Sequence, residues 1–316
     1  MKPTTSQALA FGREVAAYLS TYRHRLDDYS WGMTESCIAA ARARGLLSDR
    51  EFGGGFAETL ELRQAVAVRA RAIHAGKQGA ARVQELSALA KFVICDWGGL
   101  NGNRVETIEA YASRFTDIEP GFDEIIDHES LRSAVRLRNK RELYKFGGIA
   151  SWSKWLSFVW RDWALIYDAR IAFALDAIHL IRAVNAPVLP VPAGRNGLLA
   201  SLDAESAAAL AWQGSYGSAC QARDAMAPLS PGKPTKDDPL RVWFSKAVVP
   251  DQAAYAYYLD VMAEAHRLLW QEKRPLLHTE MLLFKISIAE IAQDFIAQML
   301  ARLGRLPEVS AVPQAA

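Results

Sequence analysis

The sequence predicts an all-α protein, because apolar residues recur at helical spacing along most of the chain and alternating strand patterns are few. Apolar residues make up 51% of the chain and charged residues 23%, so we expect most of it to fold around a sizeable core. No composition shift marks a domain break. We therefore predict a single helical unit over 1–305, with two halves around a cleft, and a flexible tail over 306–316.

The helices in the first part of the chain follow from their spacing and end signals. ESCIAAARAR at 35–44 is an amphipathic helix that Gly45 closes. Residues 60–95 form a long helical region with small residues and interspersed arginines. VETIEAYASRF at 105–115 is a further helix, and Asn103 before it is a residue type that caps helices.

The remaining helices are predicted in the same way. Residues 124–146 contain one or two helices, and a further helix follows a Gly-Gly turn over 151–163. DARIAFALDAIHLIRAV at 168–184 is a strongly apolar helix that ends before a proline. Two long helices cover 250–270 and 278–304. Proline and glycine predict loops between these segments.

Charge and cysteine content exclude several classes of protein. The net charge is only +2, so affinity for nucleic acid requires a local basic patch. The 3 cysteines are far apart, which excludes an iron–sulfur cluster held by four cysteines and argues against a disulfide framework. The histidines lack HxxxH and HExxH spacing. We therefore expect neither a metal nor any other cofactor.

The chain also lacks targeting signals of the common kinds. Charged residues interrupt the apolar stretch near the N-terminus, which argues against a signal peptide. No run of about 18 apolar residues occurs, so no membrane span is expected. Scattered cysteines suit a reducing compartment. Together these features predict a cytoplasmic protein without a membrane partner, and no obligatory protein partner is evident.

The most unusual stretch is FGGIASWSKWLSFVWRDWALIYDARI at 146–171, which forms either a rich hydrophobic core or the wall of an active site. Around its start, residues 132–161 contain many arginines and lysines and one acid, Glu142. Such an excess of positive charge forms a phosphate-binding surface or simply a solvated helix face. Gly147 and Gly148 form either a phosphate-binding turn with uncovered N–H groups or a plain corner between two helices.

Two polar residues stand out among the aromatic ones. Lys154 lies beside tryptophans near a helix start, and both features lower the pKa of an amine and favour nucleophilic attack. The alternative is a lysine whose stem packs on tryptophan with its amine in water. Asp168 sits where an N-cap belongs, and in a cleft its carboxylate can also stabilise a cationic sugar or steer an attacking group. Trp155 and Phe158 are on the face expected to pack.

The order of these features resembles the helix–hairpin–helix DNA glycosylase superfamily, in particular the bacterial proteins similar to 8-oxoguanine DNA glycosylase. The helix through Lys145, the glycine hairpin, Lys154 and the step IYD that ends at Asp168 follow the order found in that family. The later TEMLLF at 279–284 is also similar. The resemblance is specific over about 25 residues, within a helix–hairpin–helix and catalytic segment at 130–185.

The resemblance implies a helix–hairpin–helix glycosylase-like fold and a DNA N-glycosylase that flips out a modified base of double-stranded DNA and excises it. Asp168 would stabilise the sugar cation, and Lys154 would either attack C1′, with an associated AP-lyase activity, or bind a neighbouring phosphate. The base would be an oxidised purine in DNA repair or a bulky modified base of phage DNA in antiviral defence. A non-catalytic helical DNA-binding protein is the alternative.

The same resemblance implies the residues that contact DNA. The candidate DNA-binding residues are Gly147, Gly148, Ser151, Ser153, Lys145, Arg141 and Arg170. The candidates for the base pocket or for a wedge in the DNA stack are Trp152, Trp97, Asn103 and Tyr167.

Overall fold

The computed structural model confirms the all-α prediction. It describes residues 3–47, 53–100, 102, 105–114, 146–193, 201–216, 246–270 and 274–303. Pairing of extended chain within these residues is limited to two isolated bridges, Ser30 with Gly55 and Val188 with Val248. The same part of the chain contains no helix long and apolar enough to cross a membrane.

In chain order, the α-helices are α1 Thr5–Ser20, α2 Glu35–Ala43, α3 Phe56–Gly76, α4 Gly79–Lys91, α5 Val105–Arg114, α7 Ile149–Val159, α8 Ala169–Ile181, α10 Ala204–Tyr216, α13 Asp251–Leu269, α14 Leu277–Ile286 and α15 Ala292–Leu303. The 3₁₀ segments are η1 Arg23–Leu26 and η5 Phe146–Gly148, and the π-helical segments are η2 Phe92–Trp97 and η6 Ser287–Ile291.

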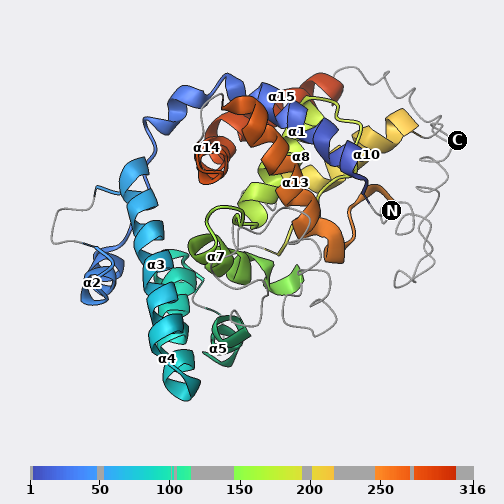
Figure 1. Ribbon diagram of the computed structural model, residues 1–316. Coiled ribbons are helices and arrows are strands. Elements are labelled where there is room, and N and C mark those ends of the chain that lie inside the picture. Colours follow the sequence, from blue (N-terminus) through green and yellow to red (C-terminus); the bar gives the residue numbers. More distant parts are fainter. Residues whose placement is uncertain are drawn as a thin grey trace, which may run out of the picture.

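The helices form two groups on either side of α7 (Figure 1). In one group α1 packs along α13, and α8 contacts α1, α10 and α15. In the other group α3 packs on α4, and α4 on α5. α7 contacts α3 and η2, so it joins the second group to the middle of the fold. The N-terminal helix thus packs against helices from the C-terminal part, which makes the fold depend on contacts between distant parts of the chain.

Several predicted helices are confirmed with their ends. α2 ends before Gly45, whose φ of +64° is a conformation that glycine adopts without strain. α5 and α13 match the predicted segments, although Asn103, the predicted cap of α5, lies outside the described residues. α8 begins at the predicted aspartate cap. α10 is a helix that the apolar pattern does not predict.

Two predicted long helices are interrupted. The region 60–95 contains two α-helices, because the chain turns at Lys77 and continues at Gly79, whose φ is +55°. The C-terminal segment changes to a π-helix at Ser287–Ile291 before it continues as α15. π-helical turns inside helices are rare and often lie at functional sites. Sequence periodicity cannot detect such a change, since one inserted residue barely alters the apolar pattern.

The central segment supplies a large part of the core. Trp155 and Phe158 of α7 are completely buried, as predicted from their shared helix face. α8 is buried along almost its whole length. A helix that is apolar all round must lie in the interior of a protein of this size, which explains why α8 is enclosed by α1, α10 and α15.

His179 gives this buried helix a pH dependence. The imidazole is 1% exposed, and its Nε2 lies 2.7 Å from the carbonyl oxygen of Ala186. Burial lowers the pKa of His179 from 6.5 to about 4, although the backbone hydrogen bond opposes that change. The unfolded chain therefore binds a proton that the folded chain excludes, so this contribution to stability is present above pH 6.5 and is lost as the pH falls toward 4.

We expect acidification from pH 7 to pH 4 to remove about 3 kcal/mol of unfolding free energy through this one group. Urea denaturation at a series of pH values measures it. In His179→Gln the amide can still donate to Ala186 but does not titrate, so the variant should lose less stability on acidification. Identical pH profiles for the two proteins would contradict the assignment.

Candidate active site

Lys154 and Asp168, the two residues predicted to be catalytic, form an ion pair. Lys154 Nζ lies 3.0 Å from Asp168 Oδ2. Lys154 projects from α7, and Asp168 caps the N-terminus of α8. A turn over Trp160–Trp163 reverses the chain, and the extended residues 164–168 bring the aspartate back beside the lysine. The fold therefore brings an amine and a carboxylate into direct contact.

Asp168 is held as a carboxylate. Burial on its own would raise the pKa of this group, but the Lys154 ammonium and the hydrogen bonds around the carboxylate outweigh burial and lower the pKa below its ordinary value. Oδ1 accepts the backbone N–H groups of Arg170 and Ile171, each at 3.1 Å. Both oxygens are thus fixed, which confirms the predicted N-cap and orients one negative charge at a helix start.

The pair is reached from the side of the aspartate. The Lys154 side chain is 6% exposed and that of Asp168 is 17% exposed. The amine also lies 3.4 Å from the carbonyl oxygen of Ala150 in the preceding turn. A substrate that approaches this pair from solvent therefore meets the carboxylate first.

Gly98 creates the space for the lysine stem. A Cβ atom on Gly98 would lie 2.8 Å from Lys154 Cδ, 2.8 Å from the carbonyl oxygen of Ile94 and 2.9 Å from that of Val93. Carbon atoms do not approach so closely without displacement, and the backbone oxygens cannot move away easily. The glycine-rich turn after η2 thus has a steric function at the ion pair.

We expect Gly98→Ala to lower the free energy of unfolding by ~1–3 kcal/mol, because the methyl group overpacks the space beside Lys154. Gly76→Ala is the matched control, since a Cβ atom there meets nothing within 4 Å. Chemical denaturation of both variants measures the difference. Equal stabilities for the two variants would rule out the close approach at Gly98.

Side chains hold the extended segment before Asp168 in place. Tyr255 Oη donates to the carbonyl oxygen of Leu165 at 2.9 Å, and Tyr258 Oη donates to that of Ile166 at 2.7 Å. Ser153 Oγ accepts the N–H group of Tyr167 at 3.0 Å. Burial raises the pKa of both Tyr255 and Tyr258, which keeps their hydroxyls protonated as donors. Three backbone groups of this segment therefore bond to side chains, although the segment belongs to no helix or sheet.

A second buried ion pair completes this support. Arg63 of α3 lies 2.7 Å from Glu280 of α14, and both residues are 2% exposed. The other carboxylate oxygen of Glu280 accepts the N–H group of Ile166 at 2.6 Å. The guanidinium also lies over the rings of Trp97 and Phe158, at 5.5 Å and 5.1 Å. Three distant parts of the chain thus meet at the segment that positions Asp168.

The structure places four predicted DNA-contacting residues in the interior. Ser153 is completely buried and its Oγ accepts the N–H group of Tyr167, so it offers no surface to DNA in this structure. Tyr167 is also completely buried, and its hydroxyl donates to the carbonyl oxygen of Pro190 at 2.7 Å. Trp152 is 2% exposed and packs edge to face against Tyr255. Trp97 is 5% exposed and stacks on Trp31.

The same physical reason explains why all four residues are buried. Each is an aromatic or polar residue, three of them near a catalytic candidate in the sequence, but the protein interior uses the same residue types to pack the core and to bond the backbone. All four side chains are buried among neighbouring residues. Ser151 is also buried in α7, which leaves it little surface for a phosphate.

The predicted glycine turn directly precedes α7. Phe146–Gly148 forms a 3₁₀ turn that leads directly into α7. Gly147 is exposed, whereas a Cβ atom on Gly148 would collide with the Tyr111 hydroxyl oxygen. Binding of a phosphate by this turn stays a prediction. Lys145, Arg141 and Asn103 lie outside the described residues.

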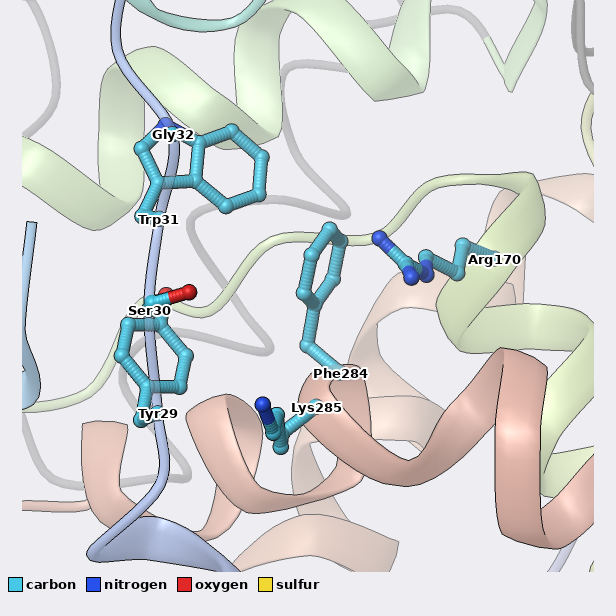
Figure 2. Close-up of a pocket in the computed structure, with 7 residues that line it drawn as sticks. All are labelled: Tyr29, Ser30, Trp31, Gly32, Arg170, Phe284 and Lys285. Atoms are coloured by element: carbon cyan, nitrogen blue, oxygen red, sulfur yellow. The ribbon is translucent and has the colours of Figure 1, made fainter.

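Arg170, a predicted DNA contact, borders a pocket of about 320 Å³ (Figure 2). The pocket is lined by Tyr29, Ser30, Trp31, Gly32, Arg170, Phe284 and Lys285. The guanidinium of Arg170 lies 4.0 Å from the centre of the Phe284 ring, and its Nε donates to Ser287 Oγ at 2.8 Å. Arg170 is in the first turn of the helix that Asp168 caps, so one wall of the pocket comes from that helix start, although neither Lys154 nor Asp168 lines the pocket.

Sequence patterns single out Lys154 and Asp168 but not this pocket or the buried support. The residues Tyr29, Trp31, Lys285 and Glu280 come from segments far apart in the sequence. One signal is available, since acids and tyrosines on otherwise apolar helix faces, such as Glu280 and Tyr258, require buried partners. Within the described residues no group of three or more histidine, cysteine or acidic side chains could hold a metal ion.

Comparisons with known proteins found no matching family model, no matching curated protein and no matching solved structure.

Proposed function

We propose that this protein is a DNA N-glycosylase that turns one modified nucleotide out of double-stranded DNA, breaks the bond between the base and C1′ and leaves an abasic site. The observation that carries the proposal is the 3.0 Å contact between Lys154 Nζ and Asp168 Oδ2 at the start of α8. The catalytic roles of the two residues are taken from the resemblance of this segment to helix–hairpin–helix glycosylases. The adjoining pocket offers a place for a base outside the stack.

The chemistry follows from the two groups. When the C1′–N bond breaks, the base leaves with the bonding electrons and the sugar becomes positively charged. The Asp168 carboxylate, oriented by two backbone N–H groups, stabilises that charge. Water then adds to C1′ and loses a proton. Alternatively, the Lys154 amine, after losing a proton, forms a bond to C1′; the C1′–O4′ bond then opens, O4′ takes up the second amine proton, and the resulting Schiff base permits strand cleavage.

The substrate is either an oxidised purine or a bulky modified base of phage DNA. In the first case the protein serves repair, and in the second it serves defence. The two classes require different room around the base, so the test must include both.

Trapping with borohydride tests the proposal and decides the role of the amine. Duplexes with 8-oxoguanine or glucosylated hydroxymethylcytosine are incubated with the wild type, with Lys154→Met and with the control Lys91→Met, which changes an exposed lysine of α4. We expect base release by the wild type and the control. A covalent complex that is lost in Lys154→Met assigns the amine as nucleophile, and release without a complex assigns attack by water.

A non-catalytic DNA-binding protein is the rival. It would bind duplexes with a strong dependence on salt but release no base from any modified DNA. If the protein neither releases a base nor binds DNA at low salt, both functions are contradicted, and a scaffold for protein partners is favoured.

A further inference from the structure

The pocket beside Asp168 combines aromatic walls with two cations. Tyr29, Trp31 and Phe284 supply the rings, and Arg170 and Lys285 supply the positive charges. No carboxylate is among its seven lining residues. Figure 2 shows the indole of Trp31 and the Arg170 guanidinium directed toward Phe284 from opposite sides. Arg170 and Trp31 both pack against Phe284, so the pocket offers aromatic contacts at its wall and two charges for an anion.

The aromatic walls are held by neighbouring residues. Trp31 stacks on Trp97 with ring centres 4.8 Å apart, and lies tilted against Phe284 at 5.1 Å. The backbone N–H group of Trp31 donates to the carbonyl oxygen of Gly54 at 2.7 Å. Tyr29 packs edge to face against Phe56. A ligand ring would thus meet surfaces that are already in place, which lowers the entropic cost of binding.

The two cations lack carboxylate partners of their own. Among the described residues neither Arg170 nor Lys285 has an acidic oxygen within 4.0 Å. Asp168 is near enough to act on Arg170 electrostatically, but its oxygens are already bonded to Lys154 and to two N–H groups. Arg170 uses Nε for Ser287, which leaves its two terminal nitrogens for a ligand. Charges in a half-buried aromatic pocket favour an anionic guest.

Residues that line or support the pocket are neighbours in sequence of residues at the ion pair. Arg170 lies two residues after Asp168 in the same helix start. On the other side Trp31 stacks on Trp97, which precedes Gly98, the residue that gives the Lys154 stem its space. Arg170 and Trp97 thus link the pocket to the ion pair, although neither Lys154 nor Asp168 lines the pocket.

We propose that this pocket takes a nucleobase that bears an anionic group, such as a carboxylated pyrimidine, with its ring in contact with the aromatic side chains and its anion bound by Arg170 or Lys285. The proposal rests on the proposed function, and it adds a third candidate to the two substrate classes named there: a base with an anionic group. The pocket of about 320 Å³ is at the lower end of the size range of ligand sites, as expected for a single substituted ring.

Calorimetric titration of the free bases tests the pocket without any catalytic step. The probes are 5-carboxycytosine, 5-hydroxymethylcytosine and cytosine, with deoxycytidine monophosphate to show whether a phosphate replaces the base-borne anion. We expect 5-carboxycytosine to bind at least ~10-fold more tightly than the two neutral bases, as a charge-assisted contact predicts. Preferential binding of the monophosphate would overturn the assignment of the anion to the base.

Variants locate the binding. Lys285→Met should remove the preference for the carboxylated base by ~10-fold and leave binding of neutral bases unchanged. Lys246→Met, which changes an exposed lysine elsewhere, should behave as the wild type. Trp31→Phe should weaken all bases alike. An unchanged preference in Lys285→Met, with the fold intact by circular dichroism, would overturn the proposal.

The two proposals fail separately. Release of an oxidised or glucosylated base from DNA, without any preference for an anionic base, would overturn the pocket assignment and keep the glycosylase. Tight binding of 5-carboxycytosine without base release from any DNA would keep the pocket and overturn the glycosylase.

Discussion

Replacing Asp168 by asparagine is expected to lower the rate of base release by ~10²–10⁴-fold, the range for loss of a positioned catalytic group. Asparagine is as good an N-cap as aspartate, so its Oδ1 can still accept the N–H groups of Arg170 and Ile171. What it removes is the negative charge beside Lys154 Nζ. A lower rate of base release in Asp168→Asn would therefore be due to the missing negative charge and not to a weakened N-cap of α8.

The same change should also destabilise the protein, because it leaves a buried ammonium without its carboxylate. Removing one partner of a buried ion pair costs ~3–5 kcal/mol, and the partial exposure of Asp168 places the expected effect at the low end. The double variant with Lys154→Met removes the stranded charge, so it should recover stability and stay inactive. Stability and activity are thereby separated.

Asp162→Asn is the matched control, since Asp162 is an exposed acid on the turn before the site. It should leave both the rate and the unfolding free energy unchanged. Single-turnover assays and denaturant unfolding measure the two quantities. A rate within a factor of about three of the wild type in Asp168→Asn would contradict a catalytic carboxylate.

Replacing Glu280 by glutamine is expected to lower the free energy of unfolding by ~3–5 kcal/mol. The amide oxygen can still accept the N–H group of Ile166, but Arg63 loses its only carboxylate partner within the described residues while it is 2% exposed. Nε and Nη1 of Arg63 already lack hydrogen-bond partners there, so no second acceptor is at hand. An uncompensated guanidinium in the core explains the size of the effect.

Equilibrium denaturation of Glu280→Gln, Arg63→Met and the double variant tests this account. Removing both charges should restore at least ~1 kcal/mol relative to Glu280→Gln alone, because no charge is then stranded. A matched control is Glu85→Gln, since Glu85 pairs with lysine and arginine near the surface and such pairs contribute little. A loss below about 1 kcal/mol in Glu280→Gln, comparable to the control, would refute a supporting role for the pair.

Sequence periodicity predicts most helices because an apolar stripe is needed wherever a helix packs on a core. It also predicts the N-cap at Asp168, since capping depends on neighbours only two and three residues away. Both features are local, so a single sequence contains the information for them. The break at Gly79 and the π-helical turn at Ser287 depend on finer geometry and escape prediction.

Features that depend on distant residues cannot be derived in the same way. The meeting of Lys154 and Asp168 is predicted through the family resemblance, and the structure brings the two side chains together. The support by Glu280 spans 114 positions to Ile166, and no spacing rule relates them. For Trp97 and Trp152 the sequence cannot separate a base-stacking ring from a core ring, because both consist of the same apolar surface.

The most direct test of the central claim is the identification of free bases released from DNA. Genomic DNA that carries oxidised, glucosylated or carboxylated bases is incubated with the wild type and with Asp168→Asn, and the small-molecule fraction is analysed by mass spectrometry. We predict that the wild type releases one modified base and that Asp168→Asn releases it at least ~10²-fold more slowly. Absence of any free base with the wild type, or equal release by the two proteins, would contradict the assignment of Lys154 and Asp168 as the centre of an N-glycosylase.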